Sequence, residues 1–296
     1  MRSNPAEFEW AAPATLEQAV KLLAGEPDAW LPIAGGTDLM VQFAAGTLQR
    51  RKFLNICNLR ELRQVQVFPG ELQVGAGSTY TDLRENQLIA REFPLLARAA
   101  SWTGGIANQN RGTLGGNIAN ASPAADSLPA LLVYGADLIL TSPRGERRVR
   151  YEDFHTGYKQ MNLAADELIR TVCLPRRFSG YISYARKIGT RKAQAIAKVC
   201  IAALGRLGTD SRRPVLEEVR IAVGSVAPVP LRLKDAEQAL HRKPLDSARV
   251  ELACKAAAAE IHPITDFRST AQYRAQVVKN LVGEFLEMLA GSRTGE

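Results

Sequence analysis

The sequence has few of the side chains that bind metals, and they lie far apart. Its four cysteines are Cys57, Cys173, Cys200 and Cys254, and no two of its three histidines share a helical i,i+4 spacing. Metal and iron–sulfur sites use short spacings such as Cys-x-x-Cys. We therefore expect no metal site on this chain, and we expect the isolated cysteines to be small buried apolar residues.

The sequence also lacks long apolar runs. The longest stretches, such as residues 128–134, fall far short of the roughly 20 residues that a membrane-spanning helix needs. Residues 1–10 contain Glu7 and Glu9 and no apolar segment, so they do not resemble a secretory signal. We expect a cytoplasmic protein.

The charge does not come with a nucleic-acid-binding pattern. The net charge is +8, and the densest basic groups are residues 50–52 and 144–150. No zinc-finger or recognition-helix pattern accompanies them. We expect a solvated basic surface or a docking face for an acidic partner. The 296 residues, 46% of them hydrophobic, suffice for two or three domains with their own cores.

Apolar periodicity and capping residues predict the elements of the first half of the chain. These are a helix at 15–24 capped by Thr15, a strand at 30–34, a helix starting at 37–44, strands at 52–56 and 72–75, a helix from Thr81 to Leu88, a helical run at 93–100 and a buried helix at 128–134.

The second half changes character near residues 177–180, where we place a domain boundary. The predicted elements are a hairpin at 137–142 and 146–149, a strand at 168–174, three antiparallel strands at 181–187, 195–207 and 216–223, and helices at 234–241, 247–260 and 273–289. No repeat of fixed period is present.

A glycine-rich loop, Ala34-Gly35-Gly36-Thr37-Asp38, joins a predicted strand to a predicted helix. Backbone N–H groups at such a turn can surround a phosphate, and glycine allows positive φ or close approach to a ligand. Alone, a Gly-Gly pair is more often a tight turn. The sequence contains neither the Rossmann G-x-G-x-x-G nor the Walker phosphate loop.

A second segment, residues 104–126, strengthens the case for a polar ligand. It is dense in glycine and short polar side chains, but Ile106, Leu114 and Ile118 interrupt it, which favours an inward fold. Buried backbone and amide groups need partners, and a polar ligand would supply them. Asp126 either caps the following helix or accepts hydrogen bonds from ribityl or ribose hydroxyls. Spacing leaves both roles open.

Together these motifs resemble the FAD-binding medium subunits of the molybdenum hydroxylases, the family of xanthine dehydrogenase, aldehyde oxidase and carbon monoxide dehydrogenase. The matching motifs occur in family order over essentially the whole chain: Leu31-Pro32-Ile33-Ala34-Gly35-Gly36-Thr37-Asp38-Leu39, Gly112-Thr113-Leu114-Gly115-Gly116-Asn117, Ser122-Pro123-x-x-Asp126, Asp166-Glu167-Leu168-Ile169, and Lys187-x-x-x-Arg191 ahead of residues 195–199.

The resemblance implies an α+β fold. An FAD-binding domain of the vanillyl-alcohol-oxidase (PCMH) type would span residues 1–178, in two subdomains of about 1–58 and 59–178. A C-terminal α+β domain would span residues 179–296, with a three-stranded antiparallel sheet and helices.

The resemblance also implies the cofactor contacts. Pro32, Ile33, Ala34, Gly35, Gly36, Thr37, Asp38 and Leu39 would wrap the FAD diphosphate. Thr113, Gly115, Gly116 and Asn117 would form a second wall along the diphosphate and ribityl chain. Asp126 would bind the ribityl or adenosine side, Ile169 would lie near the isoalloxazine, Lys187 would place a cation beside the flavin, and Thr103 would add a further contact. The alternative for Lys187 is an exposed strand lysine.

The implied function is an oxidoreductase subunit that transfers electrons. Partner subunits, a large molybdopterin subunit and a small one with iron–sulfur clusters of the 2Fe-2S type, would form a heterotrimer with this chain. Electrons would pass through FAD to NAD or another acceptor, and no acid–base residue is needed. The alternatives are a stand-alone FAD-dependent oxidase or reductase and a scaffold that has lost FAD. Residues 142–147 and 153–158 look closer to xanthine dehydrogenase-like members than to the carbon monoxide dehydrogenases, but the substrate stays open.

Overall fold

The computed structural model describes residues 4–191, 194–208 and 215–292, and these form two compact units that interleave along the chain. Unit 1 comprises Met1–Asn86, Gly104–Ala121 and Gly135–Arg176, and unit 2 comprises Gln87–Thr103, Ser122–Tyr134 and Arg177–Glu296. The chain passes from unit 1 to unit 2 for the last time between Arg176 and Arg177, next to the predicted boundary at residues 177–180. Two short earlier segments nevertheless group with the C-terminal part, so the predicted division at residue 178 stays a prediction about family domains.

Unit 1 begins with a small parallel sheet that has a helix on each face. Its strand order is β1 (Glu9–Ala11), β3 (Lys52–Asn55), β2 (Trp30–Ile33), and its helices are α1 (Leu16–Gly25) and α2 (Leu39–Ala45). Neighbouring residues of β3 point to opposite faces. Leu54 packs among residues of α1, and Phe53 packs with Leu39 and Phe43 of α2. β2 thus ends directly at the first glycine loop.

The rest of unit 1 is built on a five-stranded antiparallel sheet. Its order is β4 (Val65–Val67), β5 (Glu71–Gly75), β10 (Leu168–Pro175), β6 (Asp137–Ser142), β7 (Gly145–Arg150), and a two-stranded ribbon of β8 (His155–Gly157) and β9 (Gln160–Met161) follows β7 in the chain. The predicted hairpin and central strand are confirmed. Short helices complete the unit: α3 (Tyr80–Glu85), α6 (Ile106–Gln109) and α7 (Leu114–Ala119), with single 3-10 turns at Pro5–Glu7, Arg60–Leu62 and Tyr151–Asp153.

A helix forms in the region predicted from Thr81 to Leu88, but Thr81 is not its cap and the helix ends before Leu88. The cap of α3 is Thr79, whose Oγ1 accepts from the Asp82 N–H (3.1 Å), while the Asp82 carboxylate accepts from the Thr79 N–H (2.8 Å). This reciprocal capping box fixes the start two residues earlier. Asn86 then takes an extended conformation and ends α3 before Leu88.

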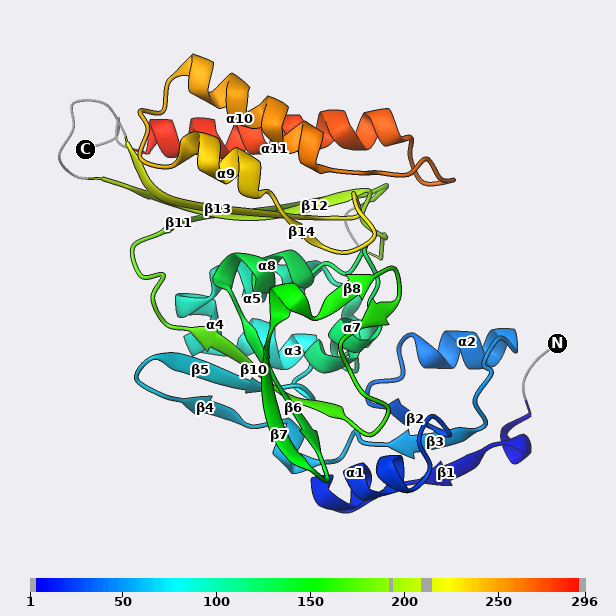
Figure 1. Cartoon of the computed structure of the whole chain (residues 1–296). Coiled ribbons are helices and arrows are strands. Elements are labelled where there is room, and N and C mark those ends of the chain that lie inside the picture. The colour runs from blue at the N-terminus through cyan, green and yellow to red at the C-terminus, as the bar shows by residue number, and fades with distance from the viewer. Residues whose placement is uncertain (1–3, 192–193, 209–214, 293–296) are drawn as a thin grey trace. The chain divides into compact units, whose positions relative to one another are not determined.

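Unit 2 is a sheet covered by helices on both faces. The strands are antiparallel in the order β11 (Ile182–Ile188), β12 (Val199–Leu207), β13 (Leu216–Gly224), β14 (Leu231–Arg232). One face packs on α9 (Lys234–Leu240), α10 (Ser247–Glu260) and α11 (Ala271–Gly291), and the other on α5 (Pro94–Trp102) and α8 (Leu128–Tyr134), with α4 (Gln87–Glu92) beside α5 (Figure 1). The three predicted strands are confirmed, and β14 adds a fourth, short one.

Burial on both faces of the sheet explains why the sequences of the strands in unit 2 contain long apolar runs. The first seven residues of β12 are buried, because alternate side chains face the two helical layers. The predicted helices at 128–134 and 247–260 coincide with α8 and α10. Within the described part of the chain, no helix combines the length and apolarity needed to cross a membrane.

The corrected cap yields a test by paired substitutions. Thr79→Ala should destabilise the protein by about 1 kcal/mol, because the Asp82 N–H loses its acceptor. That corresponds to a fall of roughly 2–4 °C in the melting midpoint by calorimetry. Thr81→Ala should change the midpoint little, because its hydroxyl makes one exposed hydrogen bond, to Asn110. A larger loss from Thr81→Ala would contradict the assignment.

Candidate functional site

The first glycine loop is shaped by two different requirements on its glycines. Gly36 has φ +74°, which side-chain-bearing residues rarely adopt. Gly35 has ordinary dihedrals, but a Cβ there would lie 1.8 Å from the carbonyl oxygen of Arg111. Arg111 immediately precedes residues 112–117, which we call the second loop. The two glycine loops are therefore in backbone contact within unit 1. The structure thus brings together the two predicted loops.

The backbone donors of the first loop are unused. Among the described residues, the N–H groups from Gly35 to Leu39 have no hydrogen-bond acceptor. The loop leads from β2 into α2, where the Met40 N–H donates to the Gly36 carbonyl (2.9 Å). The Asp38 carboxylate does not cap α2; it accepts from the side-chain amide of Gln42 (2.6 Å). A row of free donors at a turn is the arrangement that binds phosphate oxygens.

The second loop, in contrast, uses its donors internally. The N–H groups of Leu114 and Gly115 donate to the carbonyls of Ser78 (3.0 Å) and Ala76 (2.7 Å). Those of Gly116 and Asn117 both donate to Thr113, to its side chain (3.1 Å) and its carbonyl (3.0 Å). The second loop is therefore fixed by hydrogen bonds within the chain, and it supports the backbone of the first loop. The contact predicted for Thr113, Gly115, Gly116 and Asn117 along the cofactor stays a prediction, and only Gly116 of these four is well exposed.

A cation that sequence reasoning missed lies near the first loop. Lys159, at the turn between β8 and β9, donates to the backbone carbonyl and the side-chain oxygen of Asn120, both at 2.6 Å. Burial lowers the pKa of Lys159, and the charge of Asp38 opposes that shift. The side chain thus places positive charge within electrostatic reach of the diphosphate-binding candidate. Lys159 itself has φ +58°, and Gly157, two residues earlier, is the only glycine near this turn that the sequence offers as a signal.

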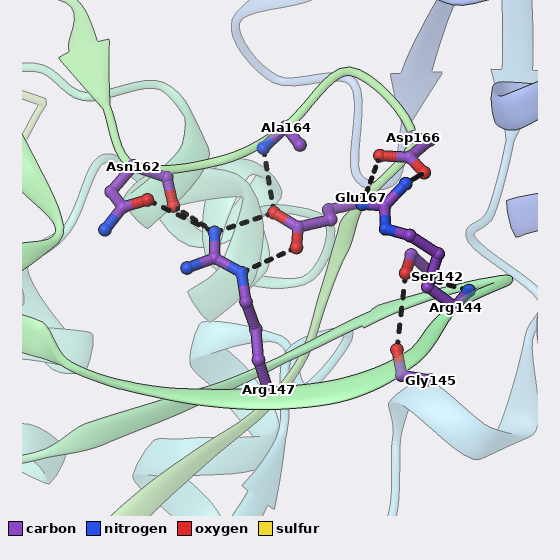
Figure 2. A network of polar contacts seen from close by, with 8 residues as sticks. All are labelled: Ser142, Arg144, Gly145, Arg147, Asn162, Ala164, Asp166 and Glu167. Atoms are coloured by element: carbon purple, nitrogen blue, oxygen red, sulfur yellow. Dashed lines mark hydrogen bonds and ion pairs between the residues drawn. The ribbon is translucent and has the colours of Figure 1, made fainter.

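Ile169 is buried on β10, and an ion-pair network holds the start of that strand (Figure 2). The guanidinium of Arg147 donates through Nε and Nη2 to the two oxygens of Glu167 (2.6 and 2.8 Å), and Nη2 also donates to the Asn162 carbonyl (2.9 Å). Glu167 further accepts from the Ala164 N–H (2.8 Å), and hydrogen bonding to Arg147 lowers the pKa of its carboxyl. The Asp166-Glu167 part of the motif therefore fixes the backbone that carries Ile169.

The basic group at 144–150 is neutralised within unit 1. Arg144 forms a bidentate pair with Asp166 (Figure 2), and Arg148 pairs with Glu71 and Asp137, both at 2.7 Å. Arg150 pairs with Glu152 and Asp153. Pairing with carboxylates leaves these guanidinium groups little free positive charge, and a docking role for the basic surface stays a prediction.

Unit 2 holds a buried ion pair made by two predicted site residues. The ammonium of Lys187, on β11, donates to Asp126 Oδ2 (2.5 Å) and to the carbonyl of Trp102 (3.0 Å). The side chains of Lys187 and Asp126 are only 8% and 7% exposed. The reading of Lys187 as an exposed strand lysine is therefore wrong. Thr103, beside Trp102, donates its hydroxyl to the Ala99 carbonyl at the end of α5 (2.8 Å).

Asp126 is not a helix cap. α8 starts at Leu128, and the second carboxylate oxygen of Asp126, Oδ1, is buried with no partner among the described residues. Burial raises the pKa of Asp126 to about 6, although the charge of Lys187 opposes the shift. An acceptor left without a donor is costly, and a ligand hydroxyl would satisfy it.

The predicted site residues thus fall into two groups, each assembled inside one unit. Unit 1 carries the first loop, the second loop and Ile169; unit 2 carries Thr103, Asp126 and Lys187. Among the described residues there is no group of three or more His, Cys, Asp or Glu side chains able to hold a metal ion.

Two families together account for most of the chain. Residues 6–177 match the FAD binding domain in molybdopterin dehydrogenase, and residues 184–289 match the CO dehydrogenase flavoprotein C-terminal domain. This pair of domains confirms the predicted fold class.

Relatives of known name match over nearly their whole length. The chain is 32% identical to the xanthine dehydrogenase FAD-binding subunit of Escherichia coli O157:H7, with 96% of each chain covered. It is 31% identical to the nicotine 6-hydroxylase medium subunit of Paenarthrobacter nicotinovorans, with 97% of this chain and 98% of the relative covered. A solved carbon monoxide dehydrogenase from Hydrogenophaga pseudoflava, lacking the Mo-pyranopterin moiety of its cofactor, matches with a TM-score of 0.90 at 27% identity over 96% of both chains.

The contact between the two loops can be tested at Gly35. Gly35→Ala should lower the free energy of unfolding by about 1–3 kcal/mol, because its Cβ must displace the Arg111 backbone. Gly25→Ala is the matched control, since a Cβ there meets nothing within 4 Å, and it should be neutral or slightly stabilising. Denaturant unfolding measures both. Equal effects would show that the loops do not need the close approach.

The buried ion pair predicts a pH-dependent defect. Lys187→Met should cost about 3–5 kcal/mol near neutral pH, because it leaves the Asp126 carboxylate buried and unpaired. Without the Lys187 charge, the raised pKa of Asp126 must rise further. A raised carboxyl pKa means that the folded chain binds a proton that the unfolded chain has released, so lowering the pH through this range favours folding.

The defect of Lys187→Met should therefore shrink between about pH 7.5 and about pH 5. The double variant Asp126→Asn with Lys187→Met should recover part of the loss at the higher pH, since it removes the unpaired charge. Denaturation at both pH values measures this. A defect independent of pH would refute the account of the pair.

Proposed function

The chain belongs to the FAD-binding subunits of the molybdenum hydroxylases, and from that premise we propose that it is the electron-exit subunit of a multi-subunit complex. In this proposal, electrons leave a substrate at a molybdenum centre on a large partner subunit. They pass through 2Fe-2S clusters on a small partner subunit and reach FAD on this chain. NAD or another acceptor then takes them from FAD. The complex would be a cytoplasmic heterotrimer or its dimer.

The observation that carries the proposal is the row of unused N–H groups from Gly35 to Leu39. A diphosphate offers the acceptors that these donors lack, and the Lys159 ammonium would add positive charge near Asp38. Residues 32–39 are proposed to wrap the diphosphate, with Gly116 and Asn117 extending that surface. Thr113 and Gly115 would act mainly by holding the loop, because both are buried.

The second group of residues is proposed to serve the other parts of the cofactor. The orphan oxygen Oδ1 of Asp126 would accept from a ribityl or ribose hydroxyl. Lys187 uses two of its three N–H groups on Asp126 and Trp102, which leaves a third for the flavin. Ile169 and Thr103 would make packing contacts. FAD, when bound, supplies a ring that accepts one or two electrons.

The roles of Asp126 and Lys187 depend on each other. The hydrogen bond from Lys187 to Asp126 (2.5 Å) fixes the position of the ammonium group. Asp126 would thus hold a cation near the ring, where positive charge stabilises the negative charge of a reduced flavin. No residue of this chain is proposed as a general acid or base.

The names and lengths of the relatives support the proposal of partner subunits. The Escherichia coli and Paenarthrobacter proteins are named as subunits, and this chain spans almost all of each. The molybdenum and iron–sulfur centres would therefore lie on other chains. Similar identity to a xanthine and to a nicotine enzyme leaves the substrate class undecided, which agrees with placing substrate choice on a partner.

Purification of the tagged chain from its own cells tests the proposal. We expect about one FAD per copy of this chain, together with a molybdopterin subunit and an iron–sulfur subunit. Substrate should bleach the flavin absorbance only in the complex, and the isolated chain should not oxidise substrate. A complex without FAD would refute the proposal. Turnover by the isolated chain would favour the stand-alone oxidoreductase instead.

A further inference from the structure

An exposed aromatic side chain stands on a tight turn between α10 and α11 in unit 2. The N–H of Asp266 donates to the Ser269 carbonyl (3.0 Å), and the N–H of Ser269 donates back to the Asp266 carbonyl (3.2 Å). Phe267 and Arg268 occupy the two central positions. In Figure 1 this segment projects past the helix ends of its unit. The Phe267 side chain is 90% exposed, and Ile264, just before the turn, is 69% exposed.

The turn is held rigidly despite its exposure. One oxygen of Asp266 accepts from the N–H groups of Arg268 (2.9 Å) and Ser269 (3.0 Å) and from Arg274 Nη2 (2.8 Å). Arg274 is buried in the first turn of α11. Its Nη1 donates to the carbonyls of Ser225 (2.6 Å) and Lys198 (3.1 Å), next to β13 and β12. Phe267 is therefore presented on a turn that is tied to the sheet.

Rigid presentation distinguishes this residue from a chance exposed side chain. Single exposed apolar residues are normal on protein surfaces. Ordering a side chain and its loop is one of the costs of association, and a turn already ordered avoids that cost. Aromatic residues that enter a pocket dominate many interfaces. Phe267, with Ile264 beside it, has the form of such an anchor.

Cations surround the apolar surface of this turn. The Arg268 guanidinium lies 4.4 Å from the Phe267 ring centroid, and Lys198 Nζ lies 5.1 Å from that of Tyr273. Asp266, the acidic residue of the turn, pairs with both Arg268 (3.1 Å) and Arg274 (2.8 Å), so one carboxylate is shared by two guanidinium groups and the turn keeps a net positive charge. A complementary surface therefore has an apolar pocket with carboxylates at its rim.

We propose that residues 264–268 dock this chain onto a partner subunit of its complex, with Phe267 entering an apolar pocket whose rim is acidic. The inference rests on the proposed function, because that function requires partner subunits. The inference goes beyond the proposed function because it assigns the docking surface of this chain and the chemistry of the partner surface that fits it.

Substitutions in the tagged chain, co-expressed with its partner subunits, test the docking surface. Phe267→Asp should weaken association with a partner subunit by roughly 30-fold or more, as expected for an interface anchor. Phe267→Leu should retain most of the association. Leu252→Asp is the control, because Leu252 is an exposed apolar residue of α10, and it should leave assembly unchanged. Size-exclusion chromatography with titration of the partner subunits measures each, and melting midpoints confirm that each variant folds.

The outcomes separate this inference from the proposed function. If the unsubstituted chain purifies without partner subunits and without FAD, the proposed function fails. If it assembles and Phe267→Asp assembles equally well, only the docking surface is refuted. It is also refuted if Phe267→Asp abolishes only self-association of this chain. Loss of binding to anionic phosphatidylglycerol vesicles, with the complex intact, would likewise refute it in favour of a membrane surface.

Discussion

The architecture of unit 1 depends on the missing side chain of Gly35. The carbonyl of Arg111 occupies the space that a Cβ would need, 1.8 Å away, so the loop after β2 and the loop before α7 share one backbone contact. The second loop is fixed in turn by hydrogen bonds to Ala76 and Ser78, beyond the end of β5. The free donors of the first loop are thereby held in place by a segment whose own donors are satisfied. The two glycine motifs therefore have different roles: the first leaves its N–H donors free, and the second holds the first in place.

Local signals in the sequence were enough to predict much of the fold. Thr15 caps α1, the strand at 30–34 leads into the glycine loop, and the hairpin at 137–149 forms as expected. Thr79 and Thr81 show the limit of this reasoning. Both are plausible caps, and the choice depends on Asp82, which reaches back to the Thr79 N–H. The two threonines are only two residues apart, so the contact with Asp82 is needed to show which of them caps the helix.

Long-range contacts could not be predicted from spacing. Lys187 and Asp126 are separated by 61 residues, and only the fold shows that they pair and bury each other. The same holds for the arginines of β7, which look like a basic patch in the sequence and are paired with acids from β5, β6 and the segment before β10. The family resemblance named the site residues, but not these pairings. Gly157 before Lys159, and Asp266 and Ser269 around Phe267, are typical turn residues, but they do not show which side chain each turn presents.

The features that point to a ligand are those that the fold does not use. Gly35 and Gly115 are needed for packing within the chain, so their presence alone says little about a cofactor. Thr113 likewise has a structural task as a helix cap. The free N–H groups from Gly35 to Leu39 and the orphan oxygen of Asp126 have no such explanation among the described residues. A buried acceptor without a donor, such as the Asp126 oxygen, reduces stability, and a buried ion pair often contributes none. A ligand hydroxyl at Asp126 would offset that cost, and phosphate oxygens at the first loop would accept from its free donors, which agrees with the dinucleotide that we propose.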